Sequence, residues 1–394
     1  MNAVYRGLKE LTFLLNDTIF ITFITLITLH LAVNIGYFIF MSKASQKPWN
    51  LKTSENYEPY VTIIIPAYME AKVIEKKIEN IVNLDYPRHK LQVIIIGDPE
   101  TIQAAKDKVR ILEGVKFLLL EEKDRLGKAG ALNYSMKFAE GEIIATSDAD
   151  AFWGSDALRN AVKYFSDPLV AALTGHEIIF NASKNIHTYS EQLYRKTYYT
   201  LRLGESKIWS TMIFQGELAL YRRDYLKQFE NKPGFSDDTG TVIRLIKEGY
   251  RCIYVPEAKF TDTAPPNLKD KVKLKSRRGQ HLTNALTNAL KYKIKGNFPL
   301  PSGIVLVNYY MHSLAPLIQL ALPIILAVSL IRDNAFFISL LLLMISTILM
   351  VKKNVRAIVE LYITSTIALT IALIRNVTGK KTIIWEKIDS MREL

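Results

Sequence analysis

Long apolar segments near both ends of the chain constrain its fold more than any other feature. Residues 19–41 run for 23 positions without Asp, Glu, Lys or Arg. A helix of about 20 apolar residues spans the hydrocarbon core of a bilayer. The stretch is too long for a cleaved signal peptide, and no small-residue cleavage site follows it. We therefore expect an uncleaved transmembrane helix within residues 1–42.

Three further apolar segments lie near the C-terminus. They are residues 304–331, 335–351 and 357–373, and the last contains one acid, Glu360. We expect transmembrane helices across residues 301–376 and a basic tail at residues 377–394. The protein is thus expected to cross the cell membrane several times.

Lysine placement predicts the orientation, because Lys and Arg near the ends of a span mark its cytoplasmic side. The residues that flank the central domain on both sides are Lys43, Lys47, Lys52, Lys291, Lys293 and Lys295. The central domain is therefore expected in the cytoplasm. Three C-terminal spans would place a basic tail outside, so one of these segments is alternatively interfacial or re-entrant.

Charge and cysteine content narrow the function classes. The net charge of +13 fits either nucleic-acid binding or a protein that lies on an anionic leaflet and handles phosphorylated substrates. The apolar segments favour the second, and the chain lacks the aromatic-interleaved basic surface that nucleic-acid modules need. We expect no nucleic-acid partner. A single cysteine, Cys252, excludes an intramolecular disulfide.

The central region, residues 43–265, alternates between strand-like and helix-like segments. The strand-like segments are residues 61–65, 92–96, 115–120 and 142–147, and the helix-like ones are 70–84, 101–112 and 128–139. This alternation predicts an α/β domain with a mostly parallel sheet covered on both faces.

A basic amphipathic segment follows the domain at residues 266–300. Leu282, Leu286, Leu290 and Ile294 recur every four residues along it. Such a helix is expected to lie in the headgroup plane, and a solvated charged helix is the alternative.

Polar side chains gather where the predicted strands end. Tyr68 and Glu70 follow the first strand, Asp98 follows the second, and Asp148 and Asp150 follow the fourth. In a parallel sheet the ligand crevice lies outside these ends. Alternation along a strand points Asp148 and Asp150 the same way, and paired carboxylates suit Mg²⁺ or Mn²⁺ that also binds substrate phosphates. The sequence therefore predicts a metal–nucleotide site.

The second half of the domain is less regular. Asp237 and Asp238 precede a predicted helix at residues 241–248. Either carboxylate could simply cap that helix, so the pair alone does not establish a functional site.

Seven short segments, in order over roughly residues 60–280, resemble membrane-anchored family 2 glycosyltransferases with a GT-A fold. That group includes cellulose, hyaluronan and poly-N-acetylglucosamine synthases and polyprenyl-phosphate sugar transferases. The segments are Ile63-Ile64-Ile65-Pro66-Ala67-Tyr68-Met69-Glu70, Lys128-Ala129-Gly130-Ala131-Leu132-Asn133, Asp148-Ala149-Asp150, Phe214-Gln215-Gly216, Gly234-Phe235-Ser236-Asp237-Asp238, Arg244-Leu245 with Gly249-Tyr250, and Arg277-Arg278-Gly279.

The resemblance implies a GT-A (Rossmann-like) domain flanked by transmembrane helices, and it implies a role for each matched residue. Tyr68, Glu70 and Asp98 would line the nucleotide base and ribose, and Lys128 would lie near the donor. Asp148 would contact the nucleotide and the metal, Asp150 would bind the metal, and Arg277 or Arg278 would hold the diphosphate. Asp238 would be the general base, and Gln215, Gly216 and Asp237 would lie by the acceptor.

The implied activity is metal-dependent, inverting transfer of a sugar from a nucleotide-diphosphate sugar, more often a UDP-sugar than a GDP-sugar. A membrane lipid or a lipid-linked glycan would accept it. The chain departs from the family at Met69, where Asn is usual, at Gly97-Asp98, where only one of two carboxylates survives, and at Gly279. Processive synthases have Trp where this chain has Gly279, which favours single-sugar transfer. The alternatives are a processive polysaccharide synthase and a catalytically silent subunit of a synthase complex.

Overall fold

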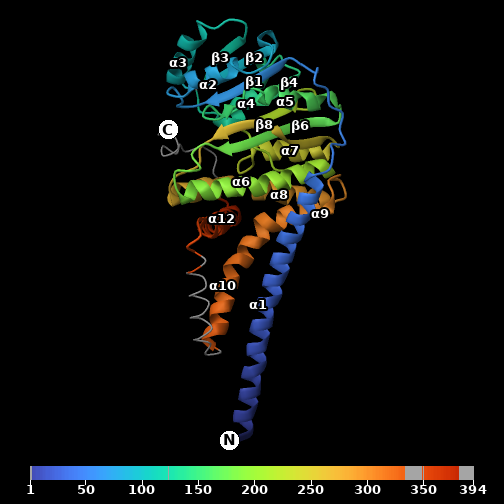
Figure 1. Ribbon diagram of the computed structural model, residues 1–394, viewed down its shortest axis with the longest axis vertical. Coiled ribbons are helices and arrows are strands. Elements are labelled where there is room, and N and C mark those ends of the chain that lie inside the picture. Colours follow the sequence, from blue (N-terminus) through green and yellow to red (C-terminus); the bar gives the residue numbers. More distant parts are fainter. Residues whose placement is uncertain (1, 123, 333–347, 349, 381–394) are drawn as a thin grey trace.

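The computed structural model describes residues 2–122, 124–332, 348 and 350–380 (Figure 1). Most of the apolar segment 335–351 and residues 381–394 of the basic tail lie outside the described residues.

The strands and helices divide the described chain as follows. The strands are β1 (Val61–Ala67), β2 (Leu91–Gly97), β3 (Lys116–Glu121), β4 (Ile143–Thr146), β5 (Phe152–Trp153), β6 (Val170–Ile179), β7 (Ala219–Arg222) and β8 (Arg251–Asp262). The helices are α1 (Asn2–Ser45), α2 (Ile74–Val82), α3 (Pro99–Val109), α4 (Gly127–Ser135), α5 (Ala157–Val162), α6 (Ile186–Ile208), α7 (Asp237–Lys247), α8 (Leu268–Ile294), α9 (Ser302–Tyr309), α10 (Ala315–Arg332) and α12 (Lys353–Val377).

These strands form one sheet, in the order β3-β2-β1-β4-β7-β6-β8-β5. The four strands β3, β2, β1 and β4 are parallel, as the alternation predicted. β7 pairs antiparallel with β4 and with β6, and β6 pairs parallel with β8. The predicted α/β class is confirmed, with a sheet that is parallel in one half and mixed in the other.

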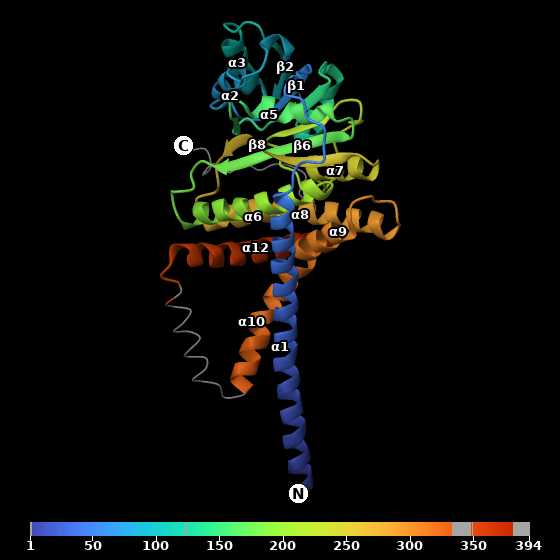
Figure 2. The same ribbon diagram turned by 45° about the vertical axis from the view of Figure 1, so that its right-hand side comes forward.

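Two apolar layers cover the sheet because its apolar strands alternate their side chains. In β1, Ile63 and Ile65 join the layer formed with α2, α3 and α5. Ile64 joins the other layer, formed with α4, α6, α7 and α8. This second layer also contains Met41 of α1 and Ile304 of α9. α6 and α8 lie between the sheet and α12 (Figures 1 and 2).

The sequence analysis did not predict α6. This helix buries Arg202, Glu205 and Ser206, so its inner face is not apolar in the sequence. Glu205 accepts hydrogen bonds from Tyr37 of α1 at 2.6 Å and from Asn308 of α9 at 2.7 Å. The buried Glu205 thereby links α1 and α9 to α6, beneath the sheet of the α/β domain.

The apolar stripe of α8 has a different neighbour from the one expected. Leu286 is fully buried in the layer against the sheet, and Leu282 and Leu290 pack partly buried on the same layer. Only Ile294, 76% exposed, lies open. The stripe is a core face of the α/β domain, and α12 also packs against α8.

Among the residues that the structure describes, three helical segments are long and apolar enough to cross a membrane: Thr18–Ser45, Ser302–Ile331 and Lys353–Val377. Figures 1 and 2 show α1 and α10 extending away from the α/β domain, whereas α12 lies across them beneath α6 and α8.

Candidate active site

The ends of β1 and β2 lie so close that only glycine fits at one position. Ala67 is the register partner of Gly97, and a Cβ on Gly97 would lie 2.1 Å from the Ala67 carbonyl oxygen. This approach places the loop after β1 beside Asp98. The Asp98 carboxylate accepts hydrogen bonds from the Met69 backbone N–H and from Thr101, whose Oγ1 lies 2.7 Å away.

Asp98 is therefore a structural residue whatever it binds. Its side chain also accepts from the Thr101 backbone N–H at 3.2 Å and so caps α3. Partial burial acts to raise the pKa of Asp98, but the hydrogen bonds from Met69 and Thr101 outweigh it and lower the pKa. The carboxylate stays ionised and fixes the loop that carries Tyr68. Contact with a nucleotide stays a prediction for Asp98.

The Tyr68 ring, 39% exposed, has a cation against it. The Arg125 guanidinium lies 4.6 Å from the ring centroid, within cation–π range. The sequence analysis missed Arg125, which no matched motif contains. Glu70, two residues after Tyr68, is buried, and its backbone N–H donates to Thr101 Oγ1 at 2.9 Å.

Lys128 and Asp148 form an ion pair at the end of β4. The Lys128 ammonium donates to the Asp148 carboxylate, and their side chains are only 12% and 15% exposed. Burial opposes the charge on Lys128, but the carboxylates of Asp148, Asp237 and Glu217 outweigh it and raise its pKa. The lysine is thus a fixed cation where the resemblance expects the donor.

Asp150 lies in a region with more carboxylates than cations. Burial and the neighbouring Asp148 raise the pKa of Asp150 to about 6. A divalent cation would relieve this repulsion, so the residues fit a metal held by Asp148 and Asp150. In the described part of the chain, no three His, Cys, Asp or Glu side chains are arranged to hold a metal. Substrate phosphate and water would therefore complete the coordination.

Asp238 lies in the first turn of α7, beside the Lys128–Asp148 pair. Ser236, not Asp237 or Asp238, is the N-cap of α7. A Cβ added to Gly216 would lie 3.0 Å from Lys128 Nζ and 3.5 Å from Asp238 Oδ2. Both groups therefore approach the space that a side chain at Gly216 would occupy. Burial and the adjacent Asp237 raise the pKa of Asp238 to about 7, which suits a general base at neutral pH.

Arg278 is already paired within the protein. Its guanidinium donates to the Glu217 carboxylate at 2.8 Å, and the carboxylates around Arg278 raise its pKa although burial opposes them. A donor diphosphate at Arg278 would have to replace Glu217 as its partner. Arg277 is also buried. The sequence analysis did not identify Glu217.

Gln215 belongs to a second set of buried charges. Its amide nitrogen donates to Glu177, which also pairs with Arg195 at 2.9 Å. The side-chain amide oxygen of Gln215, Oε1, is buried without a hydrogen-bond partner among the described residues. Burial raises the pKa of Glu177 to about 7. Glu177 and Arg195 were missed because they lie in β6 and α6, outside every matched segment.

A cavity of about 360 Å³ connects these groups to the apolar helices. Its polar lining includes Lys128, Gln215, Asp237, Asp238, Arg277 and Arg278. Its apolar lining includes Leu274 and Leu282 of α8, Ala315 of α10, and Ala368 and Leu369 of α12. The cavity thus reaches from Asp238, the predicted base, to the apolar helices. Its lining does not include Tyr68, Glu70, Asp98, Asp148 or Asp150.

Comparison with known proteins identifies the fold that holds this site. The family model described as "Glycosyltransferase like family 2" matches residues 59–280, more than half of the chain. The chain belongs to this glycosyltransferase family. It is therefore an enzyme, and the family resemblance drawn from the sequence is confirmed.

A solved structure extends the family 2 match to almost the whole chain. It is the mannosyltransferase PcManGT from Pyrobaculum calidifontis in complex with GDP-Man and Mn²⁺, 30% identical with a TM-score of 0.76. The match covers 93% of this chain and 99% of that one. It supports the GT-A fold together with the apolar helices.

Curated relatives match over shorter stretches. A β-monoglucosyldiacylglycerol synthase from Nostoc sp. is 35% identical over 133 residues, which is 33% of this chain and 28% of the relative. A poly-β-1,6-N-acetyl-D-glucosamine synthase from Staphylococcus aureus is 25% identical over 211 residues, 53% of this chain and 51% of the relative. The chain thus spans about a quarter to a half of the curated relatives it matches. The family includes enzymes named for lipid and for polysaccharide products.

Proposed function

We propose that this family 2 glycosyltransferase transfers one sugar, with inversion, from a nucleotide-diphosphate sugar to a membrane lipid or lipid-linked acceptor. The cavity carries this proposal. It contains Asp238 at a polar end and continues to Leu282 of α8, Ala315 of α10 and Leu369 of α12, on the side of the fold that carries the apolar helices. An acceptor with a polar hydroxyl or phosphate and an apolar tail matches both ends.

The proposed chemistry needs one base and a stabilised leaving group. Asp238, ionised above about pH 7, takes the proton from the attacking acceptor group. Lys128 and Arg278 are buried cations that neutralise charge on the departing diphosphate. One base without a covalent intermediate leads to inversion at the anomeric carbon.

Asp148 and Asp150 are proposed to hold a divalent cation, which would add charge neutralisation at the diphosphate. The Lys128–Asp148 ion pair holds the Asp148 carboxylate in a fixed orientation. We therefore expect the metal to bind together with the donor, since the donor supplies the remaining ligands.

The donor base is proposed from the relative that matches along its whole length. The sequence analysis favoured a UDP-sugar, whereas the Pyrobaculum mannosyltransferase binds GDP-Man. That match covers 99% of its chain, so we propose GDP-mannose as the first donor to test and UDP-sugars as the second.

Single transfer, and not polymerisation, is supported by the surroundings of Gly279. Processive relatives are expected to carry Trp at this position. A Cβ on Gly279 would lie 3.1 Å from Leu369 and 3.4 Å from Ala372, both on α12. α12 therefore occupies the space that an indole ring would need.

The experiment uses the full-length protein in lipid micelles, with labelled GDP-mannose or UDP-sugars, with and without Mn²⁺. We expect a metal-dependent, organic-extractable product that carries one sugar of inverted anomeric configuration. A ladder of long chains would support a processive synthase instead. Absence of transfer from every donor to lipid, with hydrolysis intact, would refute the lipid acceptor.

We also propose that the catalytic domain faces the cytoplasm from the cell membrane. The lysines around the domain support this orientation, and the three apolar helical segments support attachment to the membrane.

A further inference from the structure

α12 is long and apolar enough to cross a bilayer, yet it runs across the other apolar helices. Figure 1 shows α12 end-on beneath α6 and α8, and Figure 2 shows it lengthwise, while α1 and α10 point away from the catalytic domain in both views. Composition alone therefore does not reveal how this helix meets the membrane. Its contacts along its length do.

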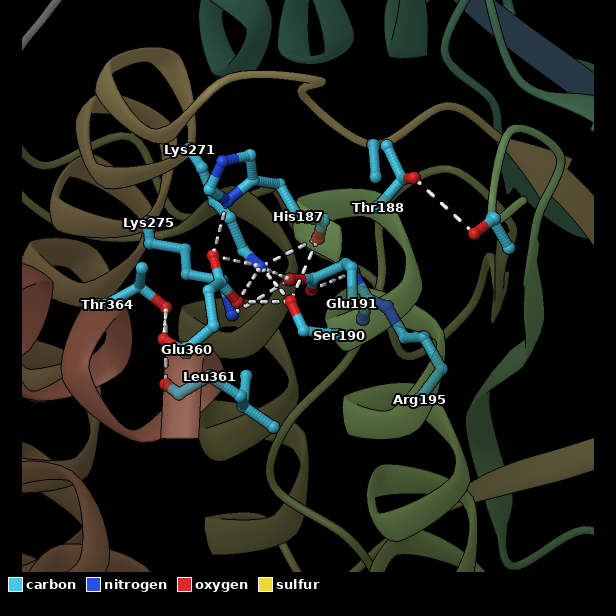
Figure 3. A network of polar contacts seen from close by, with 12 residues as sticks. His187, Thr188, Ser190, Glu191, Arg195, Lys271, Lys275, Glu360, Leu361 and Thr364 are labelled. Carbon is cyan, nitrogen blue, oxygen red and sulfur yellow. Dashed lines mark hydrogen bonds and ion pairs between the residues drawn. The ribbon is translucent and has the colours of Figure 1, made fainter. Parts of the chain in front are cut away.

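The first half of α12 is bound to the catalytic domain through Glu360. Its carboxylate lies 2.9 Å from Lys271 Nζ of α8 and 2.9 Å from His187 Nδ1 of α6 (Figure 3). Ser190 of α6 also donates a hydrogen bond to it. The Lys271 side chain is only 1% exposed, so this ion pair lies inside the protein. An acid in an apolar helix is expensive in lipid and therefore points to a partner in the protein.

The second half of α12 is bound to α8. Gly279 leaves room for Ala372 at the helix contact, and Asn376 donates to Thr283 Oγ1 at 2.9 Å. From Glu360 to Asn376 the helix rises ~24 Å. A helix that crosses the bilayer away from the domain could touch it at one end only, whereas α12 touches it at both.

We propose that α12 does not cross the bilayer but lies in the plane of the leaflet next to the catalytic domain, with its outer face against acyl chains. In this position it forms the membrane-side wall of the cavity through Ser365, Ala368 and Leu369. The inference does not depend on the donor or on the reaction.

The depth of α12 follows from its contacts with the crossing helices. Gln319 of α10 lies 3.4 Å from His30 of α1 and accepts a hydrogen bond from Thr366 of α12 at 2.6 Å. The next charged residues along α1 and α10 are Asp17 and Arg332, each 13 residues beyond this level. These two charged residues mark the far boundary of the hydrocarbon core. Thirteen residues of helix span ~20 Å, whereas the core is about 30 Å thick. α12 thus lies ~10 Å inside the near boundary, close to the depth at which interfacial helices settle.

The outer face of α12 is apolar and open. Ile363, Ile367 and Ile374 are 48%, 40% and 57% exposed. Exposed apolar side chains of α10, among them Leu320 and Ile324, continue this surface below the same level. A surface continuous with membrane-crossing helices is covered by lipid, so acyl chains lie against this face of α12.

Flat placement also settles the side of the tail. Asn376 remains beside α8, so the chain leaves α12 on the catalytic-domain side of the membrane. The basic residues Arg375 and Lys380 then lie on the same side as the lysines that flank the domain. The conflict with the positive-inside pattern disappears.

Spin labels at single introduced cysteines test the proposal in full-length protein reconstituted in phosphatidylcholine–phosphatidylglycerol vesicles. Ile363→Cys, Ile367→Cys and Ile374→Cys report on α12. Leu320→Cys, Ile324→Cys and Ile331→Cys have the same spacing and report on α10. The native Cys252 is buried, and the unsubstituted protein corrects for its labelling. Depth is measured from the relative access of oxygen and a nickel chelate.

We expect equal, shallow depths at the three α12 positions and a change of ~16 Å along α10. A gradient on α12 like that on α10 would overturn the proposal. Low access of both reagents at all three α12 positions would also overturn it, because a second protein copy would then cover the face.

A C-terminal epitope gives an independent measurement if a labelled variant fails to fold. Protease access to the epitope is expected from the side that exposes the catalytic domain. Access from the opposite side contradicts a flat α12.

Discussion

At the residue scale, burial gives Asp238 its chemistry. An exposed aspartate has a pKa near 3.9 and would be a weak base. Burial beside Asp237 raises the pKa of Asp238 to about 7, while Lys128 across Gly216 keeps a positive charge nearby. The same motif in a solvated loop would only cap a helix.

Asp238→Asn tests the proposed base directly. We expect the rate of sugar transfer to fall by roughly 10² to 10⁴, because the amide cannot accept the proton. Donor binding, measured by calorimetry, should stay within about threefold because Asp238 is not proposed to touch the donor. Asp224→Asn, at an exposed acid, is the matched control and should retain full activity. An active Asp238→Asn variant would exclude Asp238 as the base.

The pH dependence of transfer has a predicted sign. Below about pH 7 Asp238 is protonated and cannot act as a base, so kcat/KM should rise with pH through that value and then level off. Rates measured between pH 5.5 and 9 at saturating metal would show this limb. A profile that is flat from pH 5.5 upward would assign the base to a group with an ordinary carboxylate pKa.

Gly216→Ala tests how closely Lys128 and Asp238 are placed. The new methyl group would lie 3.0 Å from Lys128 Nζ and displace it. We expect transfer to slow by roughly 10- to 100-fold with little change in folding, as misplacement of about 1 Å has this effect. Gly303→Ala, where no atom lies within 4 Å, is the control and should be silent. Equal activity of both variants would show that Lys128 is not needed at its observed position.

At the element scale, buried ion pairs join helices that the sequence separates widely. Lys271 of α8 and Glu360 of α12 lie 89 residues apart in the sequence. Glu191 of α6 lies 3.8 Å from Lys271 and 2.9 Å from Lys275. Burial lowers the pKa of Lys271 although these carboxylates oppose it. The charge of this lysine therefore depends on its partners.

Glu360→Gln should destabilise the protein by about 3 kcal/mol because it leaves Lys271 charged, buried and poorly compensated. Adding Lys271→Met should restore most of the loss, since an apolar pair costs no desolvation of charge. Near-UV circular dichroism, recorded as the protein unfolds in detergent, measures the stability of both variants. Glu248→Gln removes the more exposed Lys227–Glu248 pair and should cost under about 1 kcal/mol. If the double variant were less stable than Glu360→Gln, the ion-pair explanation would be wrong.

At the scale of the whole molecule, the cavity joins two parts that meet only after folding. The catalytic domain supplies Asp238 and Arg278, and the apolar helices supply Ala315 and Leu369. If the acceptor binds in this cavity, as proposed, its recognition depends on how the helices dock beneath the sheet.

Acceptors of increasing chain length test this arrangement. We expect kcat/KM to rise by roughly fourfold for each methylene that enters the apolar end of the cavity, and then to level off. Each acceptor is assayed below its critical micelle concentration, with the same donor throughout the series. No dependence on chain length would show that the acceptor tail does not use this cavity.

The sequence alone determined the membrane class, the parallel half of the sheet and the family. Apolar length, alternation and ordered short motifs are local properties, so β1 to β4 and the loop after β1 could be assigned from residue order. The same reasoning placed Asp148, Asp150 and Asp238 in the predicted site.

Only the tertiary structure decided which residues meet across the fold. The Glu217–Arg278 pair, the burial of Arg202 and Glu205 in α6, and the Glu360–Lys271 contact join segments whose local patterns do not indicate their partners. α12 shows the physical reason most clearly. Its composition fits a membrane crossing, but its orientation is set by buried polar contacts with α6 and α8, and these form only when the helices pack.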